Sequence, residues 1–216
     1  IDITSGEVKM SDIRRRIGLV FQYPEYQLFE ETIYKDVAFG PLNLGLTQEE
    51  TDRRVKTAIK LVGLDYEEID RRSPFELSGG QKRRVAIAGV IAMEPEILIL
   101  DEPTAGLDPK SHADILQMIQ IIHSARNTTI IIVSHNMDDI ARLTNKILVL
   151  DKGKLAMAGT PAEVFSQADY LESLGLGLPL SAYLMNELRK RRIPVSEGIL
   201  NIDEAEEELY SILKTY

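Results

Sequence analysis

Short apolar runs recur along the chain, and four of them predict β-strands. They occupy residues 97–100, 129–133, 147–150 and, as a shorter fourth run, 17–21. These runs are continuously apolar rather than alternating with polar residues, which is typical of buried parallel strands. A hairpin is also predicted, because residues 148–150 and 154–157 flank the turn sequence Asp151-Lys152-Gly153.

Amphipathic helices are predicted between these runs. Apolar residues recur at i, i+3, i+4 and i+7 in two segments, at Val55, Ala58, Ile59 and Val62 and at Ile115, Met118, Ile119 and Ile122. Thr47 and Glu50 have the spacing of a capping box before the first of these helices, and Gly63 is a natural stop. Thr160, Pro161 and Glu163 supply an N-cap, a first-turn proline and an acid at the third helical position for a later helix. The alternation of strands and helices predicts an α/β layered fold.

Beyond about residue 165 the sequence changes in character. Residues 174–179 alternate Leu and Gly and end in Pro, which predicts a hinge or linker. A short helix is expected next and ends in the basic run 189–192, and an acidic helix is predicted over residues 203–214. Charge runs of this kind are typical of a solvated helix face.

Composition narrows the class of protein. The chain has 216 residues and a formal net charge of −9, which fits one large domain or one domain with an appendage. This acidity argues against a nucleic-acid binder, which needs a basic face. The printed sequence has no cysteine, so disulfides, thiolate zinc sites and a cysteine nucleophile are excluded. Its longest apolar stretch, 85–93, is too short to span a bilayer, which needs roughly 20 residues.

The stretch Leu77-Ser78-Gly79-Gly80-Gln81 carries the strongest chemical signal. Ser78 and Gln81 have the spacing of a capping box, and the two glycines let a ligand approach the backbone closely. The amides at a helix start, together with the helix dipole, favour an anion such as phosphate. The basic residues 82–84 that follow add positive charge. A plain helix cap is the alternative interpretation.

Two adjacent acids, Asp101 and Glu102, directly follow the apolar run 97–100. Consecutive residues at a strand end point in different directions, so the two carboxylates can take different roles. Asp101 is suited to hold the water shell of a magnesium ion. Glu102 is suited to orient or deprotonate an attacking water. The alternative is an ordinary turn after a strand.

Other polar residues follow the predicted strands. His135 follows the run 129–133, and parallel strand ends of an open sheet meet at one crevice, so we expect His135 near Asp101 and Glu102. Gln22 follows the run 17–21 and can contact a metal, a water or a phosphate, although a single Gln is not specific. Asp108 ends a further loop after the acid pair.

In order and spacing these stretches resemble the ABC ATPases. The Q-loop, signature motif, Walker B strand, D-loop and switch histidine of that family match Gln22, 77–81, 97–103, 105–108 and His135. Residues 20–31, 36–41 and 44–46 resemble more closely the energy-coupling factor (ECF) transporter ATPases, which drive uptake of vitamins and of cobalt or nickel ions. The resemblance covers residues 1–165 and extends into the C-terminal segment.

The resemblance implies an α/β P-loop NTPase fold of the ABC type, with a RecA-like core and a helical signature subdomain at about 24–92. It implies a partial ABC ATPase domain over residues 1–172. A C-terminal helical extension over residues 173–216 is expected to serve in dimerisation.

The resemblance also implies a mechanism in which two ATPases face each other head to tail. ATP is held between the P-loop of one subunit and the signature motif of the other. Ser78, Gly79 and Gly80, with Gln81 beside them, would contact the γ-phosphate of ATP bound on the partner.

In the subunit's own ATP site the resemblance assigns the remaining roles. Asp101 would support magnesium, and Gln22 would reach both metal and water. Glu102 would polarise the attacking water, and His135 would touch that water and the γ-phosphate. Asp108 would carry signals across the dimer. The chemistry is phosphoryl transfer to water.

The implied partners follow from the same family. They are a second ATPase subunit, identical or paralogous, a membrane-embedded coupling subunit and a substrate-binding membrane subunit, with no nucleic acid. ATP and Mg²⁺ would be required, at the cytoplasmic face of the cell membrane. Residues 23–29 would meet the coupling subunit through their aromatics and Leu28, with ordinary packing inside the helical subdomain as the alternative.

One family motif is absent from the printed sequence, the Walker A loop G-x-x-x-x-G-K-[ST]. Either the chain lacks its N-terminal part or the subunit is naturally degenerate, and the intact later motifs together with the first residue, Ile1, favour the former. Two other functions stay open. One is a non-catalytic partner that lends only its signature motif, and the other is a soluble ABC ATPase acting on DNA or ribosomes, against which the acidity speaks.

Overall fold

A computed structural model describes residues 9–126 and 128–214 and divides the chain into two compact units, residues 1–133 and 134–216. This division by packing does not test the domain boundary expected at residue 172, which stays a prediction.

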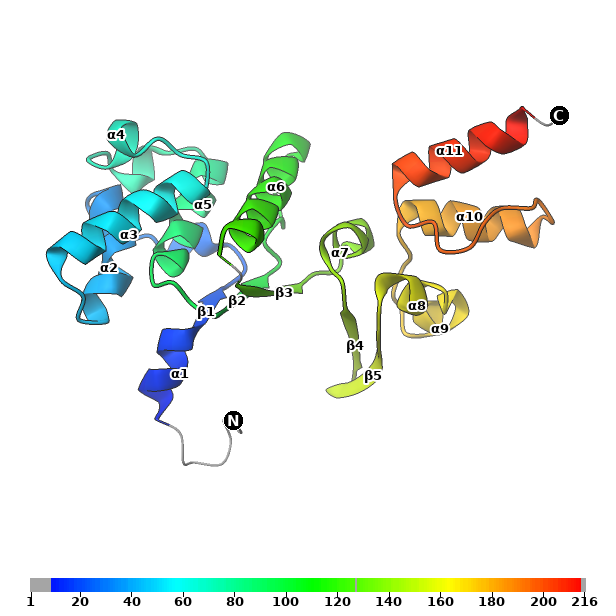
Figure 1. Ribbon diagram of the computed structural model, residues 1–216, viewed down its shortest axis with the longest axis horizontal. Helices are drawn as coiled ribbons and strands as arrows, with labels where there is room; N and C mark the ends of the chain where they lie inside the picture. The colour runs from blue at the N-terminus through cyan, green and yellow to red at the C-terminus, as the bar shows by residue number, and fades with distance from the viewer. Residues whose placement is uncertain (1–8, 127, 215–216) are drawn as a thin grey trace. The chain divides into compact units, whose positions relative to one another are not determined.

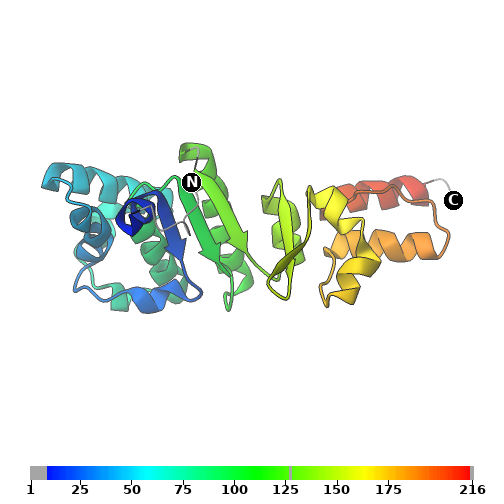
Figure 2. The same cartoon turned by 90° about the horizontal axis from the view of Figure 1, so that it is seen from below.

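The first unit is built on a three-stranded parallel sheet (Figure 2). Its strands, in sheet order, are β1 (Ile17–Val20), β2 (Ile97–Asp101) and β3 (Thr129–Val133). In register, Leu19 pairs with Ile99 and Ile99 with Ile131. The three strands predicted here are confirmed, with β1 ending one residue before Phe21.

Six helices and two short 3-10 turns complete the described part of this unit (Figure 1). They are α1 (Met10–Arg16), η1 (Pro24–Gln27), α2 (Ile33–Asn43), α3 (Gln48–Leu61), α4 (Tyr66–Ile69), η2 (Pro74–Glu76), α5 (Gly79–Ile91) and α6 (Pro109–Arg126). The apolar stripes predicted for α3 and α6 are buried in the core, as expected for amphipathic helices.

Helices α5 and α6 lie on the same side of the sheet (Figure 1). Close approach of α5 requires Gly18, because a Cβ added there would lie 2.7 Å from Val90 Cγ1. On the other face Ile131 and Val133 are 46% and 51% exposed. The expectation that the run 129–133 is fully buried is therefore wrong within the described residues, since α5 and α6 cover only one face.

Only one of the two hydrogen bonds of the predicted capping box forms at the start of α3. Thr47 Oγ1 accepts the N–H of Glu50 at 3.3 Å. The Glu50 carboxylate instead accepts hydrogen bonds from Arg53 and Arg54, at 2.7–2.8 Å, so the reciprocal bond is not made between these two described residues. Those hydrogen bonds lower the pKa of Glu50 to about 2. The predicted stop is confirmed, because Gly63 follows with φ of 73°.

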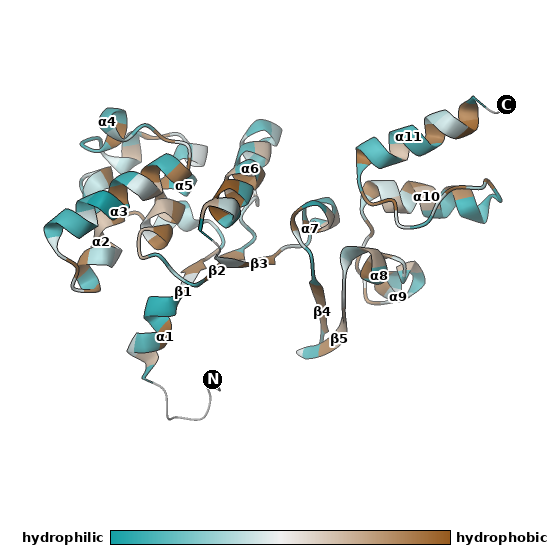
Figure 3. Cartoon of the chain, in the orientation of Figure 1, coloured by the Kyte–Doolittle hydropathy of each residue, from teal (hydrophilic) through white to brown (hydrophobic). Residues whose placement is uncertain are grey.

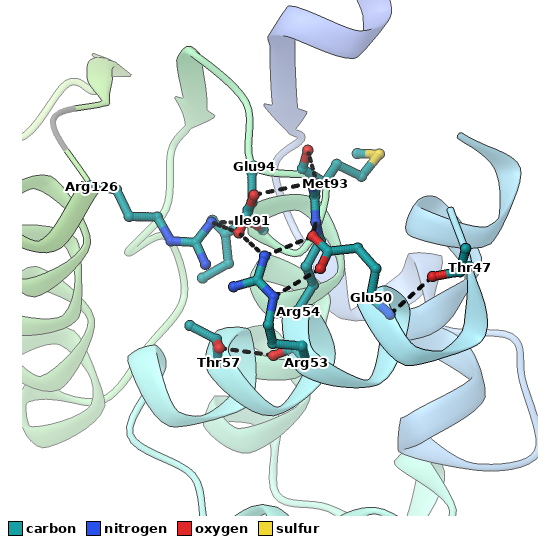
Figure 4. Close-up of polar contacts among 9 residues, drawn as sticks. All are labelled: Thr47, Glu50, Arg53, Arg54, Thr57, Ile91, Met93, Glu94 and Arg126. Atoms are coloured by element: carbon teal, nitrogen blue, oxygen red, sulfur yellow. Dashed lines mark hydrogen bonds and ion pairs between the residues drawn. The ribbon is translucent and has the colours of Figure 1, made fainter. Parts of the chain in front are cut away.

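An ion-pair network joins α3 to α6 and to the loop after α5 (Figure 4). Oxygen atoms of Glu94 lie 3.2 Å from Arg54 Nη2 and 3.3 Å from Arg126 Nη1. The same guanidinium groups donate to the carbonyls of Met93 and Ile91, each at 3.3 Å. One carboxylate therefore ties together three elements that are distant in the sequence.

The second unit consists of a hairpin and five helices in its described part. They are α7 (Met137–Leu143), β4 (Ile147–Asp151), β5 (Lys154–Gly159), α8 (Pro161–Phe165), α9 (Ala168–Ser173), α10 (Leu180–Lys190) and α11 (Ile202–Leu213). The predicted N-cap Thr160 starts α8, where Glu163 completes a capping box with it, and the predicted acidic helix is α11.

Strand β4 lies in a segment with two incompatible predictions, a buried parallel strand at 147–150 and a hairpin at 148–157. It pairs antiparallel with β5, which confirms the predicted hairpin. Lys152 and Gly153 have φ of 48° and 75°, the pair of positive values that favours a tight hairpin turn. Leu148 and Leu150 are exposed, so the expectation of a buried parallel strand at 147–150 is wrong in this part of the structure.

Helices α10 and α11 form the end of the described chain. Met185, Ile199 and Ala205 make a small buried cluster, and hydrophobic and hydrophilic residues alternate along α11 (Figure 3). The predicted linker, 174–179, lies between α9 and α10. Across the described residues, no helix has the length and apolar character needed to cross a membrane.

The Glu94 network generates a stability prediction. We expect Glu94→Gln to lower the free energy of unfolding by about 1–2 kcal/mol, because it removes the counter-charge of two mostly buried guanidinium groups. Urea denaturation measures the change. The matched control is Glu31→Gln, whose partner Lys35 is exposed, and which should lower the free energy of unfolding by clearly less. Equal costs for the two variants would contradict the role of the network.

Candidate functional site

Helix α5 begins with the predicted capping box. Ser78 Oγ accepts the N–H of Gln81 at 3.3 Å, and Gln81 Oε1 accepts the N–H of Ser78 at 3.1 Å. Ser78 and Gly79 are exposed, and a Cβ added at Gly79 would meet no atom within 4 Å. The start of this 13-residue helix is thus rigid and open, as an anion-binding helix terminus must be.

The acid pair forms a sharp corner at the end of β2. Asp101 is the last residue of the strand, and both carboxyl residues are half-buried. Glu102 has φ of 46°, an uncommon conformation for a residue other than glycine. Its N–H donates to the Val133 carbonyl at 2.9 Å, and its carbonyl accepts the N–H of Ala105 at 3.1 Å. Strained backbone that is held by its neighbours is frequent at functional sites.

Gln22 lies at the same edge of the sheet. Val20 pairs in register with Leu100, so the chain leaves β1 beside the point where β2 reaches Asp101. Gln22 is exposed. The structure therefore brings Gln22, Asp101 and Glu102 to the same end of the parallel strands, and the roles that the resemblance implies for them stay predictions.

Asp108 lies at the start of α6 and satisfies its first turn. Its carboxylate accepts the N–H groups of Lys110 and Ser111, both at 3.1 Å, and the Ser111 hydroxyl at 2.6 Å. These bonds, that from the hydroxyl first, lower the pKa of Asp108. A Cβ added at Gly80 would lie 3.3 Å from Ser111 Oγ, so the start of α5 lies close to this turn.

His135 belongs to the second unit, where it is exposed between β3 and α7. It stands two residues after Val133, the last residue of β3. Its expected place beside Asp101 and Glu102 stays a prediction.

The acidic residues of the candidate site suit Mg²⁺ that is bound together with a nucleotide. Within the described ranges, no group of three or more His, Cys, Asp or Glu side chains could hold a metal ion. Mg²⁺ at nucleotide sites is usually bound by one or two carboxylates together with substrate phosphates. The half-buried carboxylate of Asp101 fits that donor set.

The segment after Gln22 exposes aromatic side chains. Tyr26 is 84% exposed and Phe29 is 58% exposed. Phe29 also packs edge-on against Phe39 of α2, with ring centroids 5.0 Å apart. Leu28, which the sequence suggested for the same surface, is buried at 6% and belongs to the core instead.

Arg83 is the residue that sequence reasoning undervalued. The sequence places it in the basic run 82–84, which suggests a solvated side chain, yet that side chain is 1% exposed. The available signal was its position four residues before the buried Ile87, on the apolar face of α5. A charge on such a face needs partners, and Arg83 has Glu25 and two backbone carbonyls.

Comparisons with known proteins agree with this geometry. A family model described as ABC transporter matches residues 1–105. The energy-coupling factor transporter ATP-binding protein EcfA2 of Clostridium tetani is 59% identical over 212 residues, which are 98% of this chain and 74% of that protein. EcfA2 of Clostridium perfringens is 54% identical over 214 residues, 99% of this chain and 75% of its own length.

A solved structure gives the same result for the fold. CbiO1 from Clostridium perfringens, described as part of the ABC transporter complex CbiONQ, matches with a TM-score of 0.68 and 40% identity. The match covers 82% of this chain and 70% of that one. The expected α/β fold of the P-loop, ABC type is confirmed, and the chain belongs to the energy-coupling factor transporter ATP-binding proteins.

Proposed function

We propose that this chain is the ATP-binding and ATP-hydrolysing subunit of an ECF-type importer for vitamins or transition-metal ions. The observation that carries the proposal is the corner at Asp101 and Glu102, where a strained backbone is held by the Val133 carbonyl at the edge of a parallel sheet. Two carboxylates that leave a strand end in succession can serve a metal ion and a water separately.

In this proposal helix α5, which carries the signature motif, contacts the nucleotide bound to the partner subunit. Two ATPase subunits face each other head to tail, and the open start of α5 meets the γ-phosphate bound on the other subunit. Ser78, Gly79 and Gly80 supply backbone donors and a hydroxyl, with Gln81 fixing the turn through its bond to the Ser78 N–H. The helix dipole adds to the attraction of the anion.

Hydrolysis depends on positioning around the phosphate. Mg²⁺, when bound with ATP, neutralises phosphate charge, and Asp101 would hold it through water. Glu102 accepts hydrogen bonds from the attacking water and orients it, while Gln22 reaches the same water. His135 contacts the γ-phosphate, and Asp108, fixed by Ser111, carries the state of one site to the other subunit. Positioning and charge neutralisation account for most of the catalysis in phosphoryl transfer.

Coupling to transport requires a membrane partner. We assign the contact with a membrane-embedded coupling subunit to residues 23–29, because they expose Tyr26 and Phe29 beside Gln22. Exposed aromatics are enriched at protein interfaces. A substrate-binding membrane subunit completes the assembly, which places this chain at the cytoplasmic face of the membrane. Residues 173–216 are assigned to contacts within the ATPase pair.

The first test concerns Glu102. In the full gene product, assembled with its partner ATPase, we expect Glu102→Gln to bind ATP but hydrolyse it at least ~100-fold more slowly, the scale of a lost acid–base group. Phosphate release and nucleotide binding are measured on the same preparation.

The matched control is Glu49→Gln, an exposed acid on α3, which should leave turnover unchanged. Near-normal hydrolysis by Glu102→Gln would overturn its assignment. If the unsubstituted protein binds ATP but does not turn it over, the non-catalytic alternative is correct instead.

The second test concerns the aromatic surface. We expect Tyr26→Ala to reduce co-purification with the membrane subunits while nucleotide binding is retained, because Tyr26 is exposed and makes little contribution to the core. Tyr170→Ala on α9, an exposed tyrosine of the second unit, is the control and should assemble normally. Full recovery of the complex with Tyr26→Ala would argue for another contact surface.

A further inference from the structure

Arg83 is a buried cation that bridges two loops of the candidate site. Its Nε and Nη2 donate to the two carboxylate oxygens of Glu25, at 3.1 and 2.9 Å. Its Nη1 donates to the carbonyls of Pro103 and Ala105, at 3.1 and 2.8 Å. One guanidinium thus makes four hydrogen bonds from helix α5 to segments that are 58 and about 20 residues away.

The two sides of this bridge belong to different parts of the proposed mechanism. Glu25 lies in η1, within the segment 23–29 assigned to the membrane subunit. Pro103 and Ala105 directly follow Glu102, and the Ala105 N–H donates to the Glu102 carbonyl. The bridge therefore connects the docking segment with the backbone that holds the acid corner.

A second contact joins the same two segments. The Tyr23 ring lies over the Arg83 guanidinium, with 5.8 Å from Cζ to the ring centroid. A Cβ added at Gly106 would lie 3.4 Å from Tyr23 Cε1, so the ring also packs against the loop after Ala105. Tyr23 has φ of 57°, a conformation that costs energy and persists only because its surroundings fix it.

Burial makes this bridge stiff. The Arg83 side chain is 1% exposed and that of Glu25 is 17% exposed. Burial, the largest single effect, raises the pKa of Glu25. The hydrogen bonds from Arg83, a backbone hydrogen bond and the positive charge of Arg83 together outweigh it, so the pKa lies below its usual value. A planar guanidinium with fixed donors cannot follow one partner without moving away from the other.

We propose that Arg83 is a positioning residue that transmits displacement of the docking segment, through Glu25, to the loop that follows Glu102. The proposal rests on the proposed function for its direction, from membrane subunit to ATP site. The mechanical link itself does not depend on that function. A lysine cannot replace Arg83, because a single ammonium group lacks the two-sided fork that bonds Glu25 and the carbonyls together.

The link is tested first in the chain itself. Hydrogen exchange is measured at the Ala105 and Leu107 amides, which donate to the carbonyls of Glu102 and Thr104. In Glu25→Gln we expect exchange at both amides to rise about tenfold, the scale of a typical coupling free energy. The control is Glu31→Gln, an exposed acid six residues along, which should leave both amides as they were. Unchanged exchange in Glu25→Gln would overturn the link.

The second arm measures substrate uptake per ATP hydrolysed, in the assembled transporter in vesicles. Glu25→Gln should lower this ratio about tenfold. The double variant Glu25→Gln, Arg83→Lys should have the same ratio as Glu25→Gln alone, because both substitutions break the same connection between residues 23–29 and the loop after Glu102. Variants that lose thermal stability or ATP turnover but keep the wild-type ratio would show that Arg83 is structural only. If wild-type protein hydrolyses no ATP, the proposed function fails, and the exchange result still decides the link.

Discussion

The arrangement of the first unit depends on a buried positive charge. Arg83 lies on the apolar face of α5, where an unpaired guanidinium would be prohibitively costly. The chain satisfies it with one carboxylate from η1 and two carbonyls from the loop after β2. That requirement fixes helix α5, the segment after Gln22 and the corner at Asp101 and Glu102 with respect to one another.

A second charged network performs the same task further from the site. Glu94 joins α3 to α6 through Arg54 and Arg126, so these two helices are tied to each other and to the loop after α5. Both networks are built from arginine, whose several donors can bond two elements at once. Helices α3, α5 and α6 of the first unit are therefore held to their neighbours by directional polar contacts as well as by apolar packing.

Features set by neighbouring residues could be predicted from the sequence. The capping boxes at Ser78 and Thr160 depend on residues three positions apart, and both helix starts formed as expected. Thr47 formed only half of its box because Glu50 found two arginines on its own helix, at positions three and four residues on. Short-range rules fail where a stronger partner competes.

Contacts between distant segments could not be predicted in this way. Nothing near Arg83 in the sequence indicates Glu25, which precedes it by 58 residues. Leu28 suited an aromatic contact surface by its neighbours in the sequence, but the fold buries its side chain. Likewise the run at 147–150 has the composition of a buried parallel strand, and the turn at Lys152 and Gly153 directs it into a hairpin instead.

In the proposed function, the open start of α5 binds the phosphate of a nucleotide held by a second ATPase subunit. An experimental structure of the assembled transporter, with a non-hydrolysable ATP analogue and Mg²⁺, is the decisive test of this contact. We expect γ-phosphate oxygens within hydrogen-bonding distance of Ser78 Oγ and of the Gly79 or Gly80 amide, with the rest of the nucleotide on the partner subunit. A nucleotide bound away from this helix start, in an otherwise intact complex, would show that α5 does not bind the phosphate.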